Sequence, residues 1–78
     1  MHVLIIGAAG MIGRKLTERL VRDGGLGGRA IGRLPLADVV APAAPAGYSG
    51  KVETLAVDIS DRAVAVRLAS TRPNVIFH

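Results

Sequence analysis

Three glycines, spaced three residues apart, separate an apolar run from an amphipathic segment near the start of the chain. Residues 2–6 contain the run Val-Leu-Ile-Ile, which predicts a buried strand. Gly7, Gly10 and Gly13 follow it. Across residues 11–22 the apolar side chains recur at helical spacing. A strand that turns through glycines directly into a helix is the usual opening of a parallel α/β sheet, so this feature limits the fold more than any other.

The first helix is expected to bury a single stripe of apolar side chains. Ile12, Leu16 and Leu20 recur every four residues, with Met11 and Val21 beside them. The opposite face carries charged residues, namely Arg14, Lys15, Glu18, Arg19 and Arg22. The stripe therefore predicts that one face of the helix packs on the sheet and that the other face is exposed to solvent.

Strands and one further helix are predicted along the rest of the chain. Residues 26–32 are a glycine-rich connection, and strands are expected at 34–40, 52–57 and 74–78. Residues 41–47 contain too much proline for a helix and predict a loop.

The second helix has recognisable signals at both ends. Ser60 or Asp61 can cap its start, Val64 and Leu68 form its apolar stripe, and Pro73 ends it. Pro35 is compatible with the second strand only near its start, because proline has no N–H to donate.

The alternation of these elements predicts an α/β fold of the Rossmann type, a doubly wound parallel sheet in the order 3-2-1-4. Further strands usually follow the fourth in such folds. We therefore expect residues 1–78 to form the N-terminal part of a nucleotide-binding domain, with the catalytic and substrate-binding parts outside them.

Composition excludes several classes of protein. The 78 residues are 50% hydrophobic but only 3% aromatic, which suits strands buried on both faces. Cysteine is absent, so disulfide scaffolds and thiolate metal sites are excluded. No apolar run reaches the roughly 20 residues of a membrane helix, and only His2 precedes the first apolar run, unlike a signal peptide. A soluble, cytoplasmic protein is expected.

Each glycine of the triplet has a steric role in binding a dinucleotide. Gly7 allows the sharp turn, Gly10 allows a pyrophosphate to approach the backbone, and Gly13 allows the helix to lie close to the sheet. The free N–H groups near Met11 and Ile12 would then face the phosphates, assisted by the helix dipole. The alternative is that the three glycines only form a tight turn between the strand and the helix and bind no ligand.

Two acidic residues lie where the next two strands end. Asp38 is placed to accept hydrogen bonds from the adenosine ribose hydroxyls, and Asp58 lies one strand further from Gly7. The alternatives are that Asp38 only starts a turn and that Asp58 only helps the following helix to begin.

The remaining charged residues suggest no other site. His2 and His78 lack metal-ligand spacing. The net charge of +4 arises partly from the basic residues of the first helix. These residues indicate a solvent-exposed helix face, and no aromatic residues accompany them to stack on bases, so we expect no binding to nucleic acid. Arg14 could meet a 2′-phosphate and favour NADP, but the Asp38 carboxylate would repel that phosphate.

The glycine segment Ile-Gly-Ala-Ala-Gly-Met-Ile-Gly resembles the GxxGxxG motif of the extended short-chain dehydrogenases/reductases, the NAD-dependent epimerase/dehydratase family. The resemblance covers the first four strands and implies NAD as cofactor. It places Asp58 on the adenine amine and the Ile59 backbone on the adenine ring, and it matches Phe77-His78 to the end of the family's fourth strand. Ile6 stands where the family often has Thr.

Within this family, the run MHVLIIGAAGMIGRKL, the glycine-rich turn at 23–28 and the segment LADVVAP are similar to members that oxidise a four-carbon sugar acid to its 2-oxo acid. The resemblance implies a catalytic Tyr-x-x-x-Lys beyond His78, and Tyr48 is no substitute because Val52 stands four residues later. Catalytic residues are thus expected outside this chain, as is the surface of any homodimer. An NAD-dependent sugar-acid dehydrogenase, a sugar-nucleotide epimerase or dehydratase, and a non-catalytic dinucleotide sensor all fit these residues.

Overall fold

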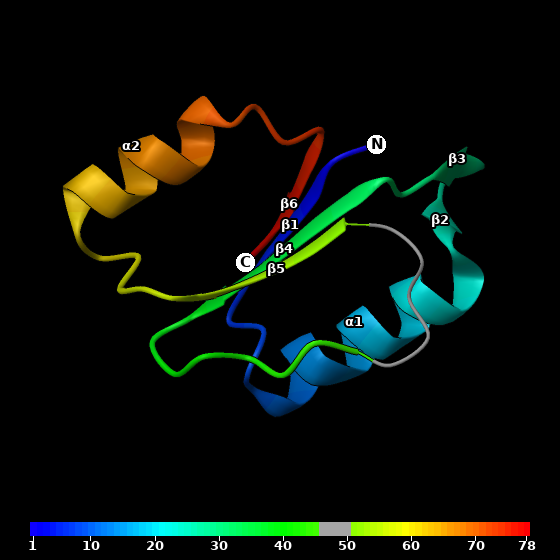
Figure 1. Cartoon of the computed structure of the whole chain (residues 1–78), viewed down its shortest axis with the longest axis horizontal. Coiled ribbons are helices and arrows are strands. Elements are labelled where there is room, and N and C mark those ends of the chain that lie inside the picture. The colour runs from blue at the N-terminus through cyan, green and yellow to red at the C-terminus, as the bar shows by residue number, and fades with distance from the viewer. Residues whose placement is uncertain (46–50) are drawn as a thin grey trace.

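A computed structural model describes residues 1–45 and 51–78, with the Lys51 side chain outside the described part. Its main sheet has the strand order β5-β4-β1-β6, and every neighbouring pair is parallel (Figure 1). The four strands are β1 (Val3–Ile6), β4 (Arg33–Asp38), β5 (Lys51–Ala56) and β6 (Val75–Phe77). This arrangement confirms the α/β class and the predicted order 3-2-1-4.

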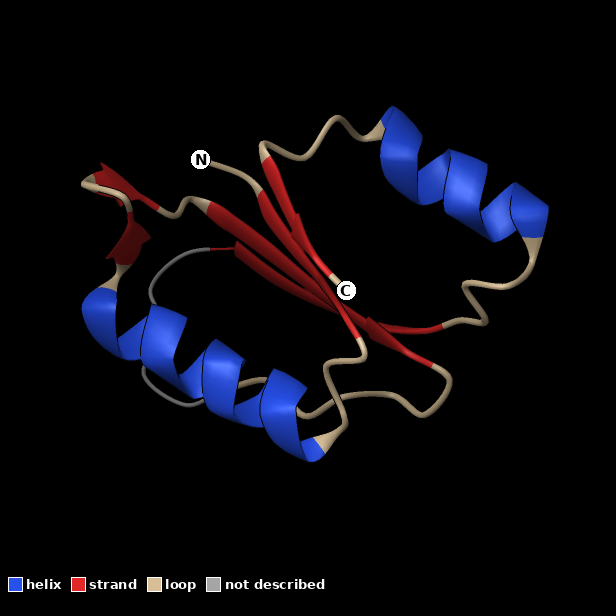
Figure 2. Cartoon of the chain, turned by 180° about the vertical axis from the view of Figure 1, so that it is seen from behind, coloured by secondary structure: helices blue, strands red, loops and turns tan. Residues whose placement is uncertain are grey.

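Two helices cover opposite faces of the sheet, as the views from the front and from behind show (Figures 1 and 2). Helix α1 spans Met11–Asp23, one residue longer than predicted, and α2 spans Arg62–Ser70. Of the two predicted caps for α2, the structure uses Asp61, whose side chain accepts a hydrogen bond from the Ala63 N–H at 2.9 Å. No described helix is both long and apolar enough to span a membrane.

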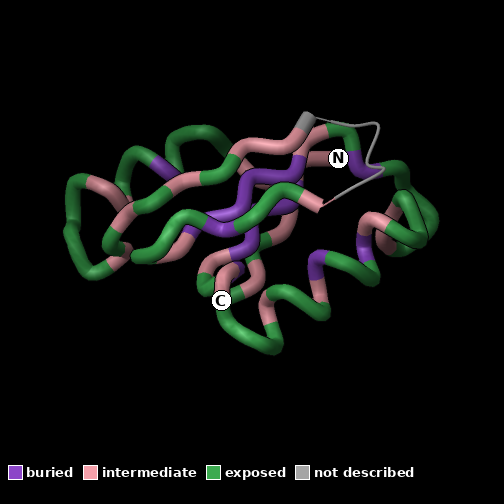
Figure 3. The backbone as a smooth tube through the Cα atoms, turned by 60° about the horizontal axis from the view of Figure 1, so that its bottom comes forward, coloured by how far each residue is buried: buried purple, intermediate pink, exposed green. Residues whose placement is uncertain are grey.

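The buried residues lie mainly along the central strands (Figure 3), and their side chains form one cluster on each face of the sheet. Alternate residues of each central strand point to opposite faces, so both sets must be apolar. The α1 face buries Val3, Ile5, Leu20, Leu34 and Leu36, whereas the α2 face buries Leu4, Ala37 and Leu68. This explains why the first strand reads as a continuous apolar run.

The predicted stripe of α1 is wrong at its first turn. The side chains of Met11 and Ile12 are 74% and 82% exposed, while Leu16 is half-buried and Leu20 is buried. The helix starts directly after the loop that leaves the carboxyl end of β1, so only its later turns can lie over the strands. Thr17 is buried instead, and its hydroxyl is satisfied by donating to the Gly13 carbonyl at 2.7 Å.

A small antiparallel hairpin lies within the segment predicted as a simple connection. It pairs β2 (Gly25–Leu26) with β3 (Arg29–Ala30). The two residues between them, Gly27 and Gly28, have φ angles of 59° and 81°, as a type I′ turn requires. A Gly-Gly pair is itself a signal for this turn.

The second, third and fourth strands differ from their predicted bounds by one or two residues at their ends. Strand β4 begins one residue earlier than predicted, at Arg33, and β6 lacks the first and last predicted residues. Strand β4 ends at Asp38 rather than residue 40, and Val39 and Val40 are each 67% exposed. Strand β5 begins and ends one residue earlier than predicted. The predicted loop is confirmed as far as residue 45, whereas residues 46–47 and Tyr48 lie outside the described residues.

Pro35 occupies the third position of β4, a strand with neighbours on both sides. The Arg33 N–H donates to the Met1 carbonyl, so alternate residues of β4, including Pro35, direct their amide nitrogens towards β1. Pairing between these strands is recorded below Pro35 at His2 and Arg33 and resumes above it with Ile5 and Leu36. Proline is therefore accommodated in a central strand by a break in one of the two ladders.

We expect Gly13→Ala to destabilise the fold strongly. A Cβ at this position would lie 2.2 Å from the Gly7 carbonyl oxygen and 2.8 Å from the Ala8 Cα. Both are backbone atoms, so relief requires moving α1, and the free energy of unfolding should fall by about 2–3 kcal/mol in denaturant titration. Gly32→Ala is the control, since a Cβ there meets nothing within 4 Å. Equal stability of the two variants would contradict this account.

Candidate functional site

The three groups singled out from the sequence lie together at the carboxyl edge of the sheet. The glycine loop follows β1, Asp38 ends β4, and Asp58 lies two residues beyond β5. A cavity of about 160 Å³ opens between the glycine loop, Asp38 and the two chain neighbours of Asp58, whereas Asp58 itself does not line it. It is lined by Ile6, Gly7, Ala37, Asp38, Val39, Val57, Ile59 and His78.

The first four N–H groups of the glycine loop are bound within the protein. Gly7 and Ala8 both donate to the Ala37 carbonyl, at 2.9 and 3.1 Å. Ala9 donates to Asp38 Oδ2 at 2.9 Å, and Gly10 donates to the Gly7 carbonyl at 3.1 Å. The end of β4 therefore holds the loop in shape before any ligand is considered.

The next three N–H groups remain available to a ligand. The Arg14 N–H donates to the Gly10 carbonyl at 2.9 Å, the first bond of the helical series. Among the described residues, no hydrogen bond uses the N–H of Met11, Ile12 or Gly13. The N-cap provides no side-chain bond and the first turn has no acidic residue, so these donors and the helix dipole suit an anion.

The protein's own packing does not require glycine at position 10. The backbone of Gly10 has φ −74° and ψ 167°, which any residue adopts, and a Cβ there would only touch the Gly7 carbonyl oxygen at 3.4 Å. Gly7 has a φ of 81° and Gly13 lies against backbone, so those two glycines are required by the fold. The space left by the missing side chain at Gly10 fits a phosphate lying close to the loop.

The carboxylate of Asp38 is half-buried and fixed by two backbone groups. Its Oδ1 accepts from the Val39 N–H at 2.7 Å, and its Oδ2 accepts from the Ala9 N–H at 2.9 Å. The bond to Val39 is local, so it is also compatible with the alternative that Asp38 only starts a turn. Each carboxylate oxygen can accept a further bond, so contact with ribose hydroxyls stays a compatible prediction.

Asp58 is exposed and lies in the turn before α2. Its Oδ1 accepts from both the N–H and the hydroxyl of Ser60, at 2.9 and 2.7 Å, and these bonds hold the pKa of Asp58 below its usual value. The Asp58 carbonyl also accepts the Asp61 N–H at 3.1 Å, so Asp58 does shape the start of the helix. Ile59 is half-buried on the α2 face and lines the cavity, where the predicted adenine contact stays untested.

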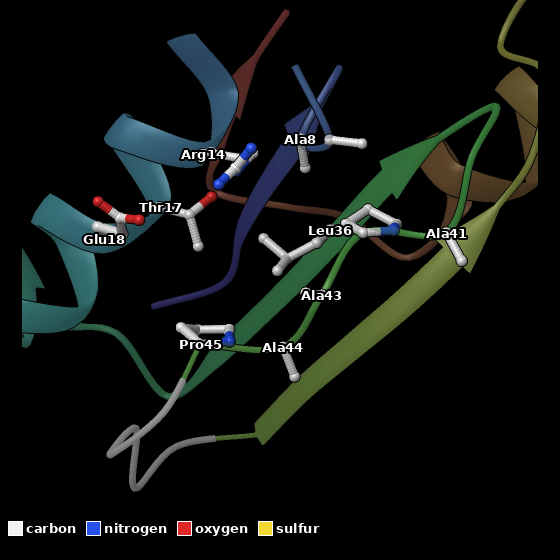
Figure 4. Close-up of a pocket in the computed structure, with 11 residues that line it drawn as sticks. Ala8, Arg14, Thr17, Glu18, Leu36, Ala41, Ala43, Ala44 and Pro45 are labelled. Carbon is white, nitrogen blue, oxygen red and sulfur yellow. The ribbon is translucent and has the colours of Figure 1, made fainter. Parts of the chain in front are cut away.

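Arg14 lines a different hollow from Asp38. A groove of about 360 Å³ lies between α1 and residues 41–45, with Leu36 at its base (Figure 4). Arg14, Thr17 and Glu18 form its helical wall. Arg14 is absent from the lining of the cavity that holds Asp38.

The two histidines lie at opposite ends of the sheet. His78 lines the cavity at the carboxyl edge, whereas His2 pairs with Arg33 at the amino ends of the strands. Burial, followed by the nearby Arg33 charge, lowers the pKa of His2, and its Nε2 is buried without a partner among the described residues. No group of three His, Asp or Glu within the described ranges could hold a metal ion.

Sequence reasoning missed the backbone contribution of β4 to the site. The Ala37 carbonyl and the Ala9 N–H fix the loop, but alanine has no side-chain signal that marks such a role. The apolar lining was missed as well, because Val39 and Val57 were assigned to the last residues of predicted strands, whereas both lie beyond the strands and line the cavity.

Comparison with known proteins agrees with this geometry. Residues 3–78 match the model of the NAD dependent epimerase/dehydratase family. The chain is 39% identical over 82 residues to a D-erythronate dehydrogenase of Cupriavidus necator, covering all of this chain and 25% of that protein. It also superimposes, with a TM-score of 0.96 and 56% identity, on the crystal structure of a nucleoside-diphosphate-sugar epimerase from Agrobacterium tumefaciens, covering all of this chain and 23% of that one.

The chain thus spans about a quarter of the length of both relatives. The family match covers nearly every residue, and the matched region includes the glycine loop with its unbonded N–H groups. On this evidence the chain belongs to the NAD-dependent epimerase/dehydratase family.

Proposed function

We propose that these residues form the NAD-binding part of an NAD-dependent oxidoreductase. The observation that carries the proposal is the set of three N–H groups, at Met11, Ile12 and Gly13, that make no hydrogen bond within residues 1–45 and 51–78. They lie beside a glycine, Gly10, that the fold does not need. These donors would hold the pyrophosphate of the cofactor. When bound, NAD supplies the acceptor for a hydride, and this chain's residues orient it.

The ribose and adenine would lie across the carboxyl ends of the strands. The Asp38 carboxylate would accept both ribose hydroxyls, and it would repel the 2′-phosphate of NADP. Strands are about 4.8 Å apart, so Asp58 lies roughly 10 Å across the sheet from the glycine loop, a distance that suits the adenine end. The backbone of Ile59, a half-buried residue, would contact the adenine ring.

For the substrate we propose a small sugar acid, D-erythronate, which would be oxidised to its 2-oxo acid. This proposal is supported by the named relative from Cupriavidus necator and by the resemblance of the first 16 residues. In this reaction the substrate carbon loses a hydride to NAD and its hydroxyl loses a proton. The residues that hold the substrate and take the proton would lie outside this chain.

A sugar-nucleotide epimerase or dehydratase is the second candidate. The higher identity, 56%, is to a structure described as a nucleoside-diphosphate-sugar epimerase. Such an enzyme would use the same NAD site without net consumption of NAD.

The two activities predict different changes in absorbance at the NADH band. We expect the full-length protein to produce stoichiometric NADH with D-erythronate or L-threonate. Conversion of UDP-sugars without NADH accumulation would support the epimerase instead. Turnover of none of these substrates, together with NAD binding, would favour a sensor.

Gly10→Val should weaken NAD binding without unfolding the protein. Its backbone angles suit valine, but the side chain would occupy the space proposed for the pyrophosphate. We expect the Kd for NAD, measured by calorimetry, to rise at least about tenfold, whereas stability should change only by the modest amount typical of a poor N-cap. Gly32→Ala is again the control. Normal NAD affinity in a folded Gly10→Val protein would show that the glycine loop does not bind the pyrophosphate.

Asp38→Ala should reduce discrimination between the two cofactors. Loss of the carboxylate removes a ribose acceptor and the repulsion of a 2′-phosphate, so the ratio of kcat/KM for NAD to that for NADP should fall by about tenfold or more. Asp23→Ala, which removes an exposed carboxylate paired with Arg19, should leave the ratio unchanged. If the ratio of kcat/KM for NAD to that for NADP is the same in Asp38→Ala and the wild type, Asp38 does not contact the ribose.

A further inference from the structure

We propose that Asp38 is also a positioning residue, which holds the glycine loop in the shape that aims the Met11 and Ile12 N–H groups at a phosphate. The proposal rests on the NAD-binding function proposed above. It assigns Asp38 a role that is separate from recognition of the ribose and that is present before any ligand binds.

The hydrogen bonds of the loop single out this side chain. Gly7 and Ala8 donate to a main-chain carbonyl, that of Ala37, which almost any residue would supply. Ala9 instead donates to Asp38 Oδ2 at 2.9 Å. Among the described residues, Asp38 is the one side chain that accepts an N–H of loop residues 7–10. The position of the Ala9 peptide therefore depends on the identity of residue 38.

The carboxylate is itself held in place. The Val39 N–H donates to Oδ1 at 2.7 Å, so the carboxylate is anchored on one oxygen and directs the other at Ala9. The half-buried bond between Ala9 and Asp38 joins residues 29 positions apart in the sequence. Hydrogen bonds to an ionised acceptor are stronger than neutral ones, which suits this bond to holding a loop.

Loss of this acceptor would act on the phosphate donors through a short, flexible connection. Only Gly10 separates Ala9 from Met11, and glycine offers little resistance to a change in backbone angles. Without Asp38 the Ala9 N–H would have to turn towards water. The peptides that follow would then be held only by the bonds from the Gly10 N–H to the Gly7 carbonyl and from the Arg14 N–H to the Gly10 carbonyl, so their direction would be less firmly fixed.

Ribose binding and loop positioning can occur together. A carboxylate has about four acceptor sites, and the two backbone N–H groups use two of them. The remaining sites can accept two ribose hydroxyls. Asp38 would thus link the ribose subsite to the phosphate subsite directly.

A ligand without a ribose separates this role from ribose recognition. Inorganic pyrophosphate can use the Met11 and Ile12 donors but offers nothing to a ribose site. If Asp38 only recognised ribose, the Asp38→Ala protein would bind pyrophosphate as tightly as the wild type or more tightly, because the substitution removes a negative charge near the phosphate. If Asp38 positions the loop, the same variant should bind pyrophosphate more weakly.

The experiment measures two quantities in the full-length protein. Amide hydrogen exchange of the peptide containing residues 7–13 is followed without ligand, and inhibition by inorganic pyrophosphate is measured in competition with NAD. For Asp38→Ala we expect exchange about tenfold faster and pyrophosphate affinity about threefold to tenfold lower, as for loss of one charge-assisted hydrogen bond. Asp23→Ala should match the wild type in both.

Asp38→Asn provides a milder variant if the alanine variant does not fold. Asparagine keeps one acceptor oxygen, so it can bind the Ala9 N–H while losing the bond to Val39. Exchange should lie between that of the wild type and Asp38→Ala, and pyrophosphate should still bind less tightly than to the wild type. Unchanged exchange and unweakened pyrophosphate binding in these variants would overturn the proposal. A wild-type protein that fails to bind NAD would instead refute the proposed function, and the exchange of residues 7–13 would still decide the role of Asp38.

Discussion

The contact between α1 and the backbone of the glycine loop is the constraint on which the rest of the structure depends. A Cβ at Gly13 would lie 2.2 Å from the Gly7 carbonyl oxygen, so the helix can begin where it does only with hydrogen at that position. This close approach places the start of α1 beside the carboxyl end of β1. The same contact sets where the later turns meet the sheet, where Leu20 is buried. The fold and the position of the phosphate site therefore both depend on the close approach of Gly13 to the backbone of the glycine loop.

Residues whose role depends on local chemistry were predictable from the sequence. The buried strands follow from unbroken apolar runs, the turn from Gly7, and the helix cap from the pair Ser60 and Asp61, of which the structure uses Asp61, because each of these features requires a particular type of side chain or backbone. The strand order follows from the alternation of elements, since parallel neighbours need a crossover connection. Asp38 and Asp58 were located correctly at the ends of their strands, to within two residues.

Features that depend on tertiary position were not predictable in the same way. Periodicity assigned Ile12 to a buried stripe, but it cannot tell which turn of a helix lies beyond the sheet, and the side chain is 82% exposed. The bond between Ala9 and Asp38 joins two distant residues, one of them an alanine without a polar side chain. Its existence could be recognised only after the loop and β4 had been placed side by side.

Pro35 removes one hydrogen-bond donor from the ladder between the two central strands, β1 and β4. The missing N–H interrupts the ladder between the two central strands, so their amino ends are joined at His2 and Arg33 separately from the pairing above. The β4–β5 ladder continues past Pro35 without a break. The β1–β6 ladder continues as well, so strands on both sides carry the sheet across the position where this one N–H is missing. The register between β1 and β4 is accordingly the same below Pro35 and above it, and the ligand-binding edge keeps its alignment although a proline stands in a central strand.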